Sequence, residues 1–371
     1  MKKKYAIIVT FIFIFAVLTI WIMSLLGKEN ESNKENIQPT LQGTVLDIRP
    51  TSSLHKLEEG MFTIQNEADY GFQEFLDQGG ASSDAEVIDF LMEDILSDSD
   101  GLAFMPNIFG CSTLAVKNEH QQTLFGRNFD WEESEALIIT SKPNDAYASI
   151  STVNLDFIQS GTSLSIHNLP DDVLAKVAMY APLDGMNEKG LAISVNMIQD
   201  SSAIHQSGQS QNLTTTTAIR LILNKAANVE EAIDLLETYN MHSSFDMMIH
   251  FAISDASGKS VVVEYVNQEM KVLETPVVTN FYLSQGEKYG IGTEQSHERY
   301  NILMEMLKKQ PAMSMVQVRD ALNRVSKDNF DEFESTEWSI VYNLKQKEIH
   351  YYHRENYDKR YVFYLNEMEV K

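Results

Sequence analysis

Cysteine is almost missing from this sequence: its 371 residues include a single thiol, Cys111. A lone cysteine cannot close a disulfide within the chain, and it cannot supply a cysteine pair to a metal ion. Cys111 is therefore either a small buried apolar group or a nucleophile. It lies in Gly110-Cys111-Ser112-Thr113, sixteen residues before Arg127, and these surroundings favour the nucleophile.

Positive charge is also scarce. The sequence has 29 lysines and arginines against 53 aspartates and glutamates, a formal net charge of −24. Nucleic-acid binding needs clustered cations, so we expect no nucleic acid as a partner. The same balance argues against close contact between the body of the protein and an anionic membrane surface.

Several catalytic and metal-binding motifs are missing as well. The sequence contains no His-Glu-x-x-His, no Gly-x-Ser-x-Gly and no glycine-rich phosphate loop. His350 and His353 lie an odd number of positions apart on a predicted strand, so they face opposite sides and cannot form a metal pair.

One long apolar run is present, at the amino terminus. Three lysines precede residues 5–27, which carry no charge. As a helix rising ~1.5 Å per residue, this run reaches about 35 Å, enough to cross a hydrocarbon core of ~30 Å. The lysines favour the amino end inside. We predict a transmembrane signal anchor over residues 1–27, a single pass through the cell membrane and an extracytoplasmic body. A cleaved signal peptide, which would make the protein secreted, is the alternative.

The rest of the chain divides into three parts. Residues 28–42 are polar and low in complexity, which predicts a linker. Residues 43–110 are predicted to be a pro-segment with one helix, begun by a capping box of Ser83 and Glu86. Residues 111–371 are predicted to be the catalytic domain. Its patterns predict strands over 111–116, 123–127, 191–197, 249–254, 261–266, 271–274, 338–344, 349–353 and 361–365, and helices over 217–226, from 228, and over 297–308.

Short connections between these strands indicate antiparallel pairing, and strands before and after two central helices suggest a sheet-on-sheet core with helices outside. In the first hairpin, a turn centred near Glu119 places residues whose numbers add to about 238 opposite each other, which sets Arg127 across from Cys111. Asp130 follows just beyond the same pair of strands. The alternative is a surface arginine–aspartate pair beside a buried cysteine.

A cysteine nucleophile needs a base, and none of the nine histidines lies in a recognisable catalytic context. A free α-amine, with a pKa of ~7.7–8.0, suits proton transfer near neutrality. Cleavage of the Gly110–Cys111 bond would place such an amine on Cys111, and Asp130 would hold its charged form. Gly110 has no side chain, which leaves its carbonyl open to attack by the neighbouring thiol.

Cys111-Ser112-Thr113 and the run Gly126 to Trp131 resemble the amino-terminal-nucleophile (Ntn) hydrolases of the choloylglycine hydrolase and acid ceramidase type, which include bile salt hydrolase and penicillin V acylase. Three further segments are similar to this family and follow in its order. They are Asp184 to Leu191 leading to Asn196, Val278-Thr279-Asn280, and Ser296 to Tyr300. The resemblance covers about residues 111–371. It implies an α+β fold, a four-layered αββα sandwich of antiparallel sheets.

The resemblance also implies roles for single residues. Cys111 would be the nucleophile and its amine the base, with Asp130 orienting the amine. Arg127 and Arg299 would stabilise the thiolate and the developing charge. Asn196 and Asn280 would bind the oxyanion or the amine, and one such donor is typically worth ~3–4 kcal/mol. Alternatively, the two asparagines are strand-end turn residues and Arg299 is a solvated helix charge.

Two departures from the family pattern stand out. Here 110 residues precede the cysteine, whereas bile salt and penicillin V enzymes usually trim only a few, so the arrangement looks more like acid ceramidase and its autocatalytic cleavage. Ser112 also stands where threonine is common.

The sequence therefore predicts an anchored amidase that matures by cleavage before Cys111. It would hydrolyse a linear, non-peptide N-acyl amide through a thioester, without metal or organic cofactor. An apolar acyl chain is expected, because the loops near 132–170 and 198–213 hold lipophilic residues. A homo-oligomer stays open. One alternative is a cysteine hydrolase or acyltransferase with a histidine base, and another is an envelope-anchored binding or structural protein with an inactive fold.

Overall fold

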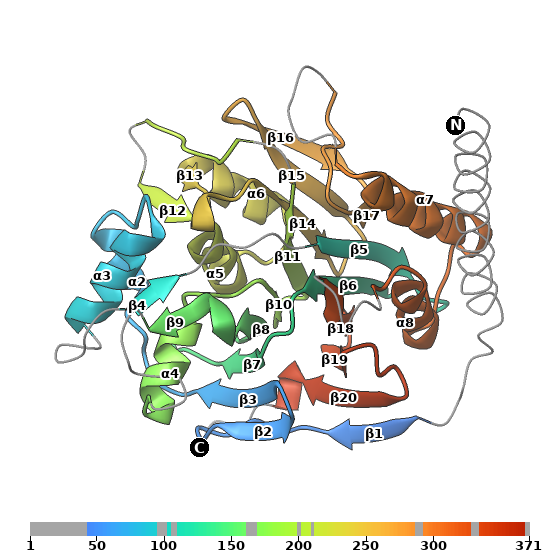
Figure 1. The fold of residues 1–371 in the computed structure, drawn as a ribbon, viewed down its shortest axis with the longest axis horizontal. Coiled ribbons are helices and arrows are strands. Elements are labelled where there is room, and N and C mark those ends of the chain that lie inside the picture. The colour runs from blue at the N-terminus through green and yellow to red at the C-terminus, as the bar shows by residue number, and fades with distance from the viewer. Residues whose placement is uncertain are drawn as a thin grey trace, which may run out of the picture. The chain divides into compact units, whose positions relative to one another are not determined.

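Two large β-sheets form the centre of the computed structural model (Figure 1). One has seven strands, in the order β1 (Thr44–Asp47), β20 (Lys359–Tyr364), β19 (Glu348–His353), β18 (Ser335–Asn343), β6 (Thr123–Trp131), β5 (Gly110–Lys117) and β17 (Val277–Val278). The other has nine, in the order β16 (Glu269–Glu274), β15 (Ser260–Val266), β14 (Ile249–Asp255), β11 (Leu191–Met197), β10 (Asp184–Asn187), β8 (Ser149–Asn154), β7 (Ala136–Ser141), β3 (Met61–Asn66) and β2 (His55–Glu58).

The structure describes residues 43–94, 102–104, 110–160, 169–198, 202–208, 211–285, 292–327 and 334–367. Residues 43–371 form one compact unit. The predicted anchor (1–27) and linker (28–42) lie outside the described residues. Within the described ranges, no helix has the length and apolarity needed to cross a membrane.

Helices cover the outer faces of both sheets. Helices α7 (Glu294–Lys309) and α8 (Met315–Arg324) pack on β5, β6, β17 and β18 of the seven-stranded sheet. Helices α4 (Asp171–Ala178), α5 (Thr215–Lys225) and α6 (Val229–Thr238) pack on the nine-stranded sheet, and Figure 1 shows α7 and α8 on the opposite side of the molecule from α4. The predicted α+β sandwich of sheets with helices outside is confirmed in this coarse form.

The expectation of antiparallel sheets needs one correction. Two pairs in the large sheets are parallel, β1 with β20 and β3 with β7. Both involve strands from residues 43–66, which pair here with strands far away in the chain, although β3 also forms a hairpin with β2. The predicted pro-segment residues therefore contribute strands to both sheets. Two short pairs complete the strands, β12 (Asn212–Thr214) with β13 (Asn240–His242) and β4 (Leu102–Phe104) with β9 (Ile158–Ser160).

Two more helices come from the same amino-terminal part, α2 (Phe72–Asp77) and α3 (Asp84–Asp94). Phe75 of α2 meets the ring of Tyr180 edge to face, with 5.6 Å between centroids. The backbone N–H of Glu86 donates to Ser83 Oγ, which confirms the predicted start of α3. Residues 43–94 thus share an apolar core with the rest of the unit.

Strands β5 and β6 are buried on both faces, and alternate side chains divide between two cores. Cys111, Phe125 and Phe129 belong to the core between the sheets. Leu114 and Leu124 belong to the core beneath α7 and α8. The thiol of Cys111 consequently faces the space between the sheets, whereas neighbours of opposite parity face the helices.

Candidate active site

Cys111 is the second residue of β5, and its side chain is fully buried. The predicted register of the first hairpin is wrong by two residues. Cys111 pairs with Phe129, and Arg127 pairs with Thr113. The turn is centred on His120 instead of Glu119, because Asn118 Oδ1 accepts the N–H groups of both His120 and Gln122. A shift of two residues leaves every side chain on its original face, so Arg127 still lies on the face of the thiol.

Arg127 reaches the thiol diagonally across the two strands. Its Nη2 lies 3.5 Å from Cys111 Sγ, and its Nη1 donates to the carbonyl of Leu183 at 2.9 Å. Its Nε lies 3.0 Å from Asp184 Oδ2. Asp184 also accepts hydrogen bonds from Trp338 Nε1 and Tyr342 OH. The guanidinium is therefore held in one orientation beside the sulfur, with its charge balanced by a buried carboxylate.

Arg299 connects the remaining groups from α7. Its Nη1 donates to the Cys111 carbonyl at 3.0 Å, to Ser112 Oγ at 2.7 Å and to Asp130 Oδ2 at 3.1 Å. Its Nη2 donates to Asn280 Oδ1 at 2.9 Å. Arg299 is 5% exposed, so the alternative of a solvated helix charge is wrong.

Asn280 binds the backbone nitrogen of Cys111. The N–H of Cys111 donates to Asn280 Oδ1 at 2.9 Å, and Asn280 Nδ2 donates to the Met197 carbonyl at 2.7 Å. The side-chain oxygen thus already contacts the atom that would become an α-amine if the preceding peptide bond were cut.

Asn196 lies one step further out. Its Nδ2 is 3.4 Å from the carbonyls of Val278 and Thr279, and its Oδ1 accepts a hydrogen bond from Ser194. Its hydrogen bonds reach the residue before Asn280 and not Cys111. Of the six predicted site residues, Cys111, Arg127, Asp130, Asn280 and Arg299 are joined by direct contacts, and Asn196 supports them from the opposite sheet.

The thiol is not an ionised nucleophile in the intact chain. Burial raises the pKa of Cys111 to about 12, because desolvation outweighs the attraction of the Arg127 cation. The carboxylates of Asp130 and Asp184 push the pKa in the same direction, and Arg299 opposes them. At neutral pH the sulfur therefore carries its proton.

A buried histidine–carboxylate pair supports the segment that carries Asn280. His250 Nε2 lies 2.8 Å from the Thr279 carbonyl, and its Nδ1 lies 3.4 Å from Glu264 Oε1. Glu264 also accepts the N–H groups of Leu283 and Ser284. Burial raises the pKa of Glu264, but these hydrogen bonds and the charge of His250 outweigh it and lower the pKa to about 2.

Sequence reasoning missed this pair, although a signal existed. His250 and Glu264 are titratable residues in mostly apolar strands. They are the next two residues along the hairpin after the paired Phe251 and Val263. Asp184 was missed as a site residue although it opens a segment of the family pattern. Its partnership with Arg127 joins the two sheets, which local pairing cannot predict.

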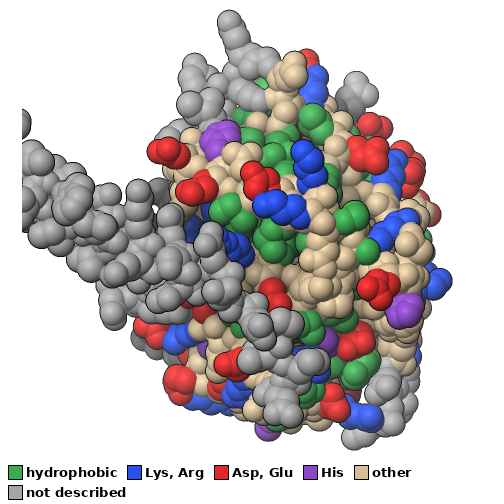
Figure 2. Space-filling view, turned by 90° about the vertical axis from the view of Figure 1, so that its right-hand side faces the viewer, with side chains coloured by type: hydrophobic (Ala, Val, Ile, Leu, Met, Phe, Trp, Pro, Cys, Tyr) green, Lys and Arg blue, Asp and Glu red, His purple; other side chains and the backbone are tan. Residues whose placement is uncertain are grey.

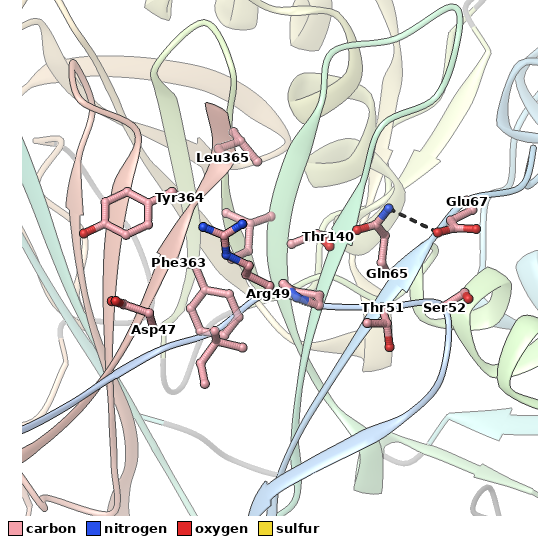
Figure 3. A pocket seen from close by; sticks show the side chains of 13 residues that line it. Asp47, Arg49, Thr51, Ser52, Gln65, Glu67, Thr140, Phe363, Tyr364 and Leu365 are labelled. Atoms are coloured by element: carbon pink, nitrogen blue, oxygen red, sulfur yellow. Dashed lines mark hydrogen bonds between the residues drawn. The ribbon is translucent and has the colours of Figure 1, made fainter. Parts of the chain in front are cut away.

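A separate cavity of about 570 Å³ lies at the other end of the seven-stranded sheet (Figure 3). Arg49 is among its labelled side chains, with Phe363 and Tyr364 on one side and Thr140 on the other. Gln65 Nε2 lies 3.5 Å from Glu67 Oε1 at its rim. Strands β19, β18 and β6 separate β20, which lines the cavity, from the strand of Cys111. The cavity shares no residue with the site around the thiol.

Neither the face seen in Figure 2 nor the described acidic residues offer a competing site of another kind. On the face seen in Figure 2, the basic side chains of the described residues are interspersed with acidic ones and form no continuous patch. Within the described parts of the chain, no three His, Cys, Asp or Glu side chains form a group that could hold a metal ion.

Comparison with known families and proteins agrees with the predicted resemblance. Residues 111–283 match the model of the linear amide C-N hydrolases, choloylglycine hydrolase family, which confirms that resemblance over these residues. A bile salt hydrolase/transferase of Lactiplantibacillus plantarum is 24% identical over 173 residues, 44% of this chain and 50% of that protein. An uncharacterized protein of Paramecium bursaria Chlorella virus 1 is 34% identical over 103 residues, 26% of this chain and 37% of that protein. The chain thus spans half or less of the length of these curated relatives.

The fold also has solved relatives. The structure of a conjugated bile acid hydrolase from Clostridium perfringens superimposes with a TM-score of 0.53, covering 70% of this chain and 93% of the other at 20% identity. At this identity the likeness establishes the fold alone, a sandwich similar to that of Ntn hydrolases.

Proposed function

Because residues 111–283 carry the sequence pattern of the choloylglycine hydrolase family, we propose that this protein hydrolyses a linear, non-peptide amide with Cys111 as an amino-terminal nucleophile. One observation carries the proposal. Arg127 contacts the sulfur of Cys111 on one side, while Asn280 contacts its backbone nitrogen on the other. The sulfur and the backbone nitrogen of Cys111, the two atoms that would react, therefore both have polar partners although the residue is buried.

The proposed reaction begins with maturation. Cleavage of the Gly110–Cys111 bond frees the amine of Cys111, which Asn280 and the charge of Asp130 hold. The amine takes the thiol proton, and the sulfur attacks the carbonyl carbon of the substrate. The leaving amine departs with a proton from the ammonium, and a thioester remains. Water then gives a proton to the amine and attacks the thioester, which releases the carboxylic acid and restores the thiol.

The charged groups support each step of this scheme. Negative charge develops on the sulfur and on the carbonyl oxygen, and the guanidinium of Arg127 already lies beside the sulfur. Asp184 fixes that guanidinium, so it need not reorganise as the charge moves. Arg299 ties Asp130 and Asn280 to the Cys111 backbone, which keeps the future amine in place.

An apolar, ring-containing acyl group is the proposed substrate class. Phe129 lies opposite Cys111 on the same face, and its ring leads to a chain of aromatic contacts. Trp131 and Phe157 have centroids 4.9 Å apart, and Phe157 and Phe245 have centroids 5.2 Å apart. The related bacterial protein is named as a bile salt hydrolase, a description that fits such surroundings. We further propose that residues 1–27 anchor the enzyme in the cell membrane with its catalytic domain outside the cytoplasm.

A histidine base is less well supported. Three of the buried histidines, 250, 350 and 353, each pair with a glutamate, Glu264, Glu348 and Glu58, and not with the thiol. An inactive binding protein with this fold remains a second candidate, because the thiol of the intact chain is buried and protonated.

The amino terminus of the purified mature protein tests the proposal. Intact mass and Edman sequencing of the wild type should give a chain that begins at Cys111, together with hydrolysis of at least one member of a panel of N-acyl amides. Cys111→Ala should remain uncut and lose activity at least about a thousandfold. Full activity from a chain with the 110–111 bond intact would favour a histidine-based enzyme, and an uncut, inactive wild type would favour a binding protein.

A further inference from the structure

Lys327 is a buried cation beside the bond that the proposed maturation cuts. A Cβ atom at position 110 would lie 2.9 Å from Lys327 Nζ and 3.1 Å from Asp130 Oδ2. Lys327 is 6% exposed, and Nζ forms an ion pair with Glu334. A side chain at position 110 would therefore crowd the space that this ammonium and carboxylate border, and the lysine would have to move aside.

The backbone around Lys327 is held firmly at this place. Its N–H donates to Thr336 Oγ1 at 2.8 Å, and its carbonyl accepts the N–H of Thr336, also at 2.8 Å. The same hydroxyl of Thr336 donates to Asp130 Oδ1 at 2.7 Å. Thr336 thus links Lys327 to Asp130, the carboxylate that would hold the new amine. The charges of Lys327 and Asp130 therefore both lie on the side of β5 that faces the helices.

Cleavage creates two charges where none existed. The thiol adds to the Gly110 carbonyl carbon, the C–N bond breaks, and the sulfur proton moves to nitrogen, which leaves a thioester between Gly110 and the sulfur of Cys111. Water then breaks the C–S bond, which returns a proton to the sulfur, and the proton of the new acid passes to the amine of Cys111, which leaves a carboxylate on Gly110, a free thiol and an ammonium. The side-chain oxygens of Asn280 and Asp130 are placed for the ammonium, and the hydrogen bond of Asn280 Nδ2 goes to the Met197 carbonyl and not to Gly110.

We propose that Lys327 stabilises the negative charge that develops at the Gly110 carbonyl during this cleavage, and then binds the carboxylate of the new chain end. Lys327 has three N–H donors, and Glu334 takes one of them. The inference rests on the proposed maturation before Cys111, and it assigns the ligand as the carboxyl end of the chain's own amino-terminal part.

Cleavage kinetics of the full chain test this assignment without any substrate. The protein is produced as an uncut precursor by brief expression, and intact mass then follows the appearance of the fragment that begins at Cys111. Lys327→Met should slow cleavage by about tenfold or more, as expected on removing a group that stabilises developing charge. Lys327→Arg, which keeps a cation, should stay within about threefold of the wild type.

Two further variants separate this role from a structural ion pair. Glu334→Gln breaks the pair but leaves the ammonium beside Gly110, so cleavage should not slow. Lys359→Met removes another ion-paired lysine, which lies on β20 and is bound to Glu58, and serves as the matched control. Equal slowing by Lys327→Met and Glu334→Gln would overturn the assignment, and so would an unchanged rate in Lys327→Met. A wild type that never cleaves would instead refute the proposed maturation itself.

Discussion

Glu264 provides the most quantitative test of how the site is supported. Its carboxylate is fully buried, and His250 and the N–H groups of Leu283 and Ser284 lower its pKa from the ordinary 4.5 to about 2. Since 1.36 kcal/mol corresponds to one pH unit, the ionised form contributes about 3 kcal/mol to folding at neutral pH. We predict that Glu264→Gln loses up to this amount.

The pH dependence has a definite sign. The folded pKa is depressed, so between about pH 4.5 and pH 2 the unfolded chain binds the proton more readily, and the stabilisation is lost as the pH falls. Between pH 6.5 and pH 3.5 this single group should cost the wild type about 1.4 kcal/mol that the variant does not lose. The stability difference between wild type and Glu264→Gln should shrink by that amount.

Urea unfolding of both proteins at the two pH values measures this difference. Glu230→Gln is the matched control, because Glu230 forms an exposed ion pair with Lys259 and should change stability little at either pH. A difference between wild type and Glu264→Gln that stays constant from pH 6.5 to pH 3.5 would refute the assignment of a depressed pKa. The variant should also slow cleavage before Cys111, because His250 would hold the Thr279 carbonyl less firmly next to Asn280.

Three other predictions concern the frame of the site. Arg127→Met should lower the unfolding free energy by about 3–5 kcal/mol, since it strands the buried Asp184 charge; adding Asp184→Leu should recover part of the loss in thermal melts, and no recovery would contradict this. Asn187→Ala should cost about 2 kcal/mol, because its side chain bonds the carbonyls of Leu223 and Ala226 at the end of α5 and the N–H of Lys189 in a turn. It should leave cleavage intact, and a well-folded variant that no longer cleaves would refute this. After cleavage, residues 43–110 should co-elute with 111–371 in size exclusion, because β1 is hydrogen-bonded into the seven-stranded sheet and β3 into the nine-stranded sheet. A catalytic part that elutes alone would contradict this.

Local pattern predicted much of the fold. The strand over residues 191–197 matches β11, and the helix predicted over 297–308 is α7 with a few more residues at its start. Alternation and capping are properties of neighbouring residues, so a single sequence displays them. The parallel pairs of β1 and β3 were not predicted, because no turn connects them to their partners and register then depends on packing across the whole molecule.

The candidate site divides in the same way. The hairpin brought Cys111 and Arg127 to one face even with the register wrong by two, since the alternation of a strand survives an even shift. The resemblance supplied Asn280 and Arg299. Other residues reach the site from strands and loops far away in the chain, namely Asp184, Glu264 and Lys327. Each is a buried member of an ion pair, and its role can be recognised only when its partner is seen.

The amino-acid sequence alone determined that there is one thiol, which segments alternate in polarity, and which family those segments resemble, because each is a property of order along the chain. Only the tertiary structure decided that the thiol faces the core between the sheets while Asp130 faces the helices, since that depends on two cores packing on opposite sides of one buried hairpin. It also decided that residues 43–94 are built into the same unit as Cys111, because edge strands find their partners through space and not through sequence.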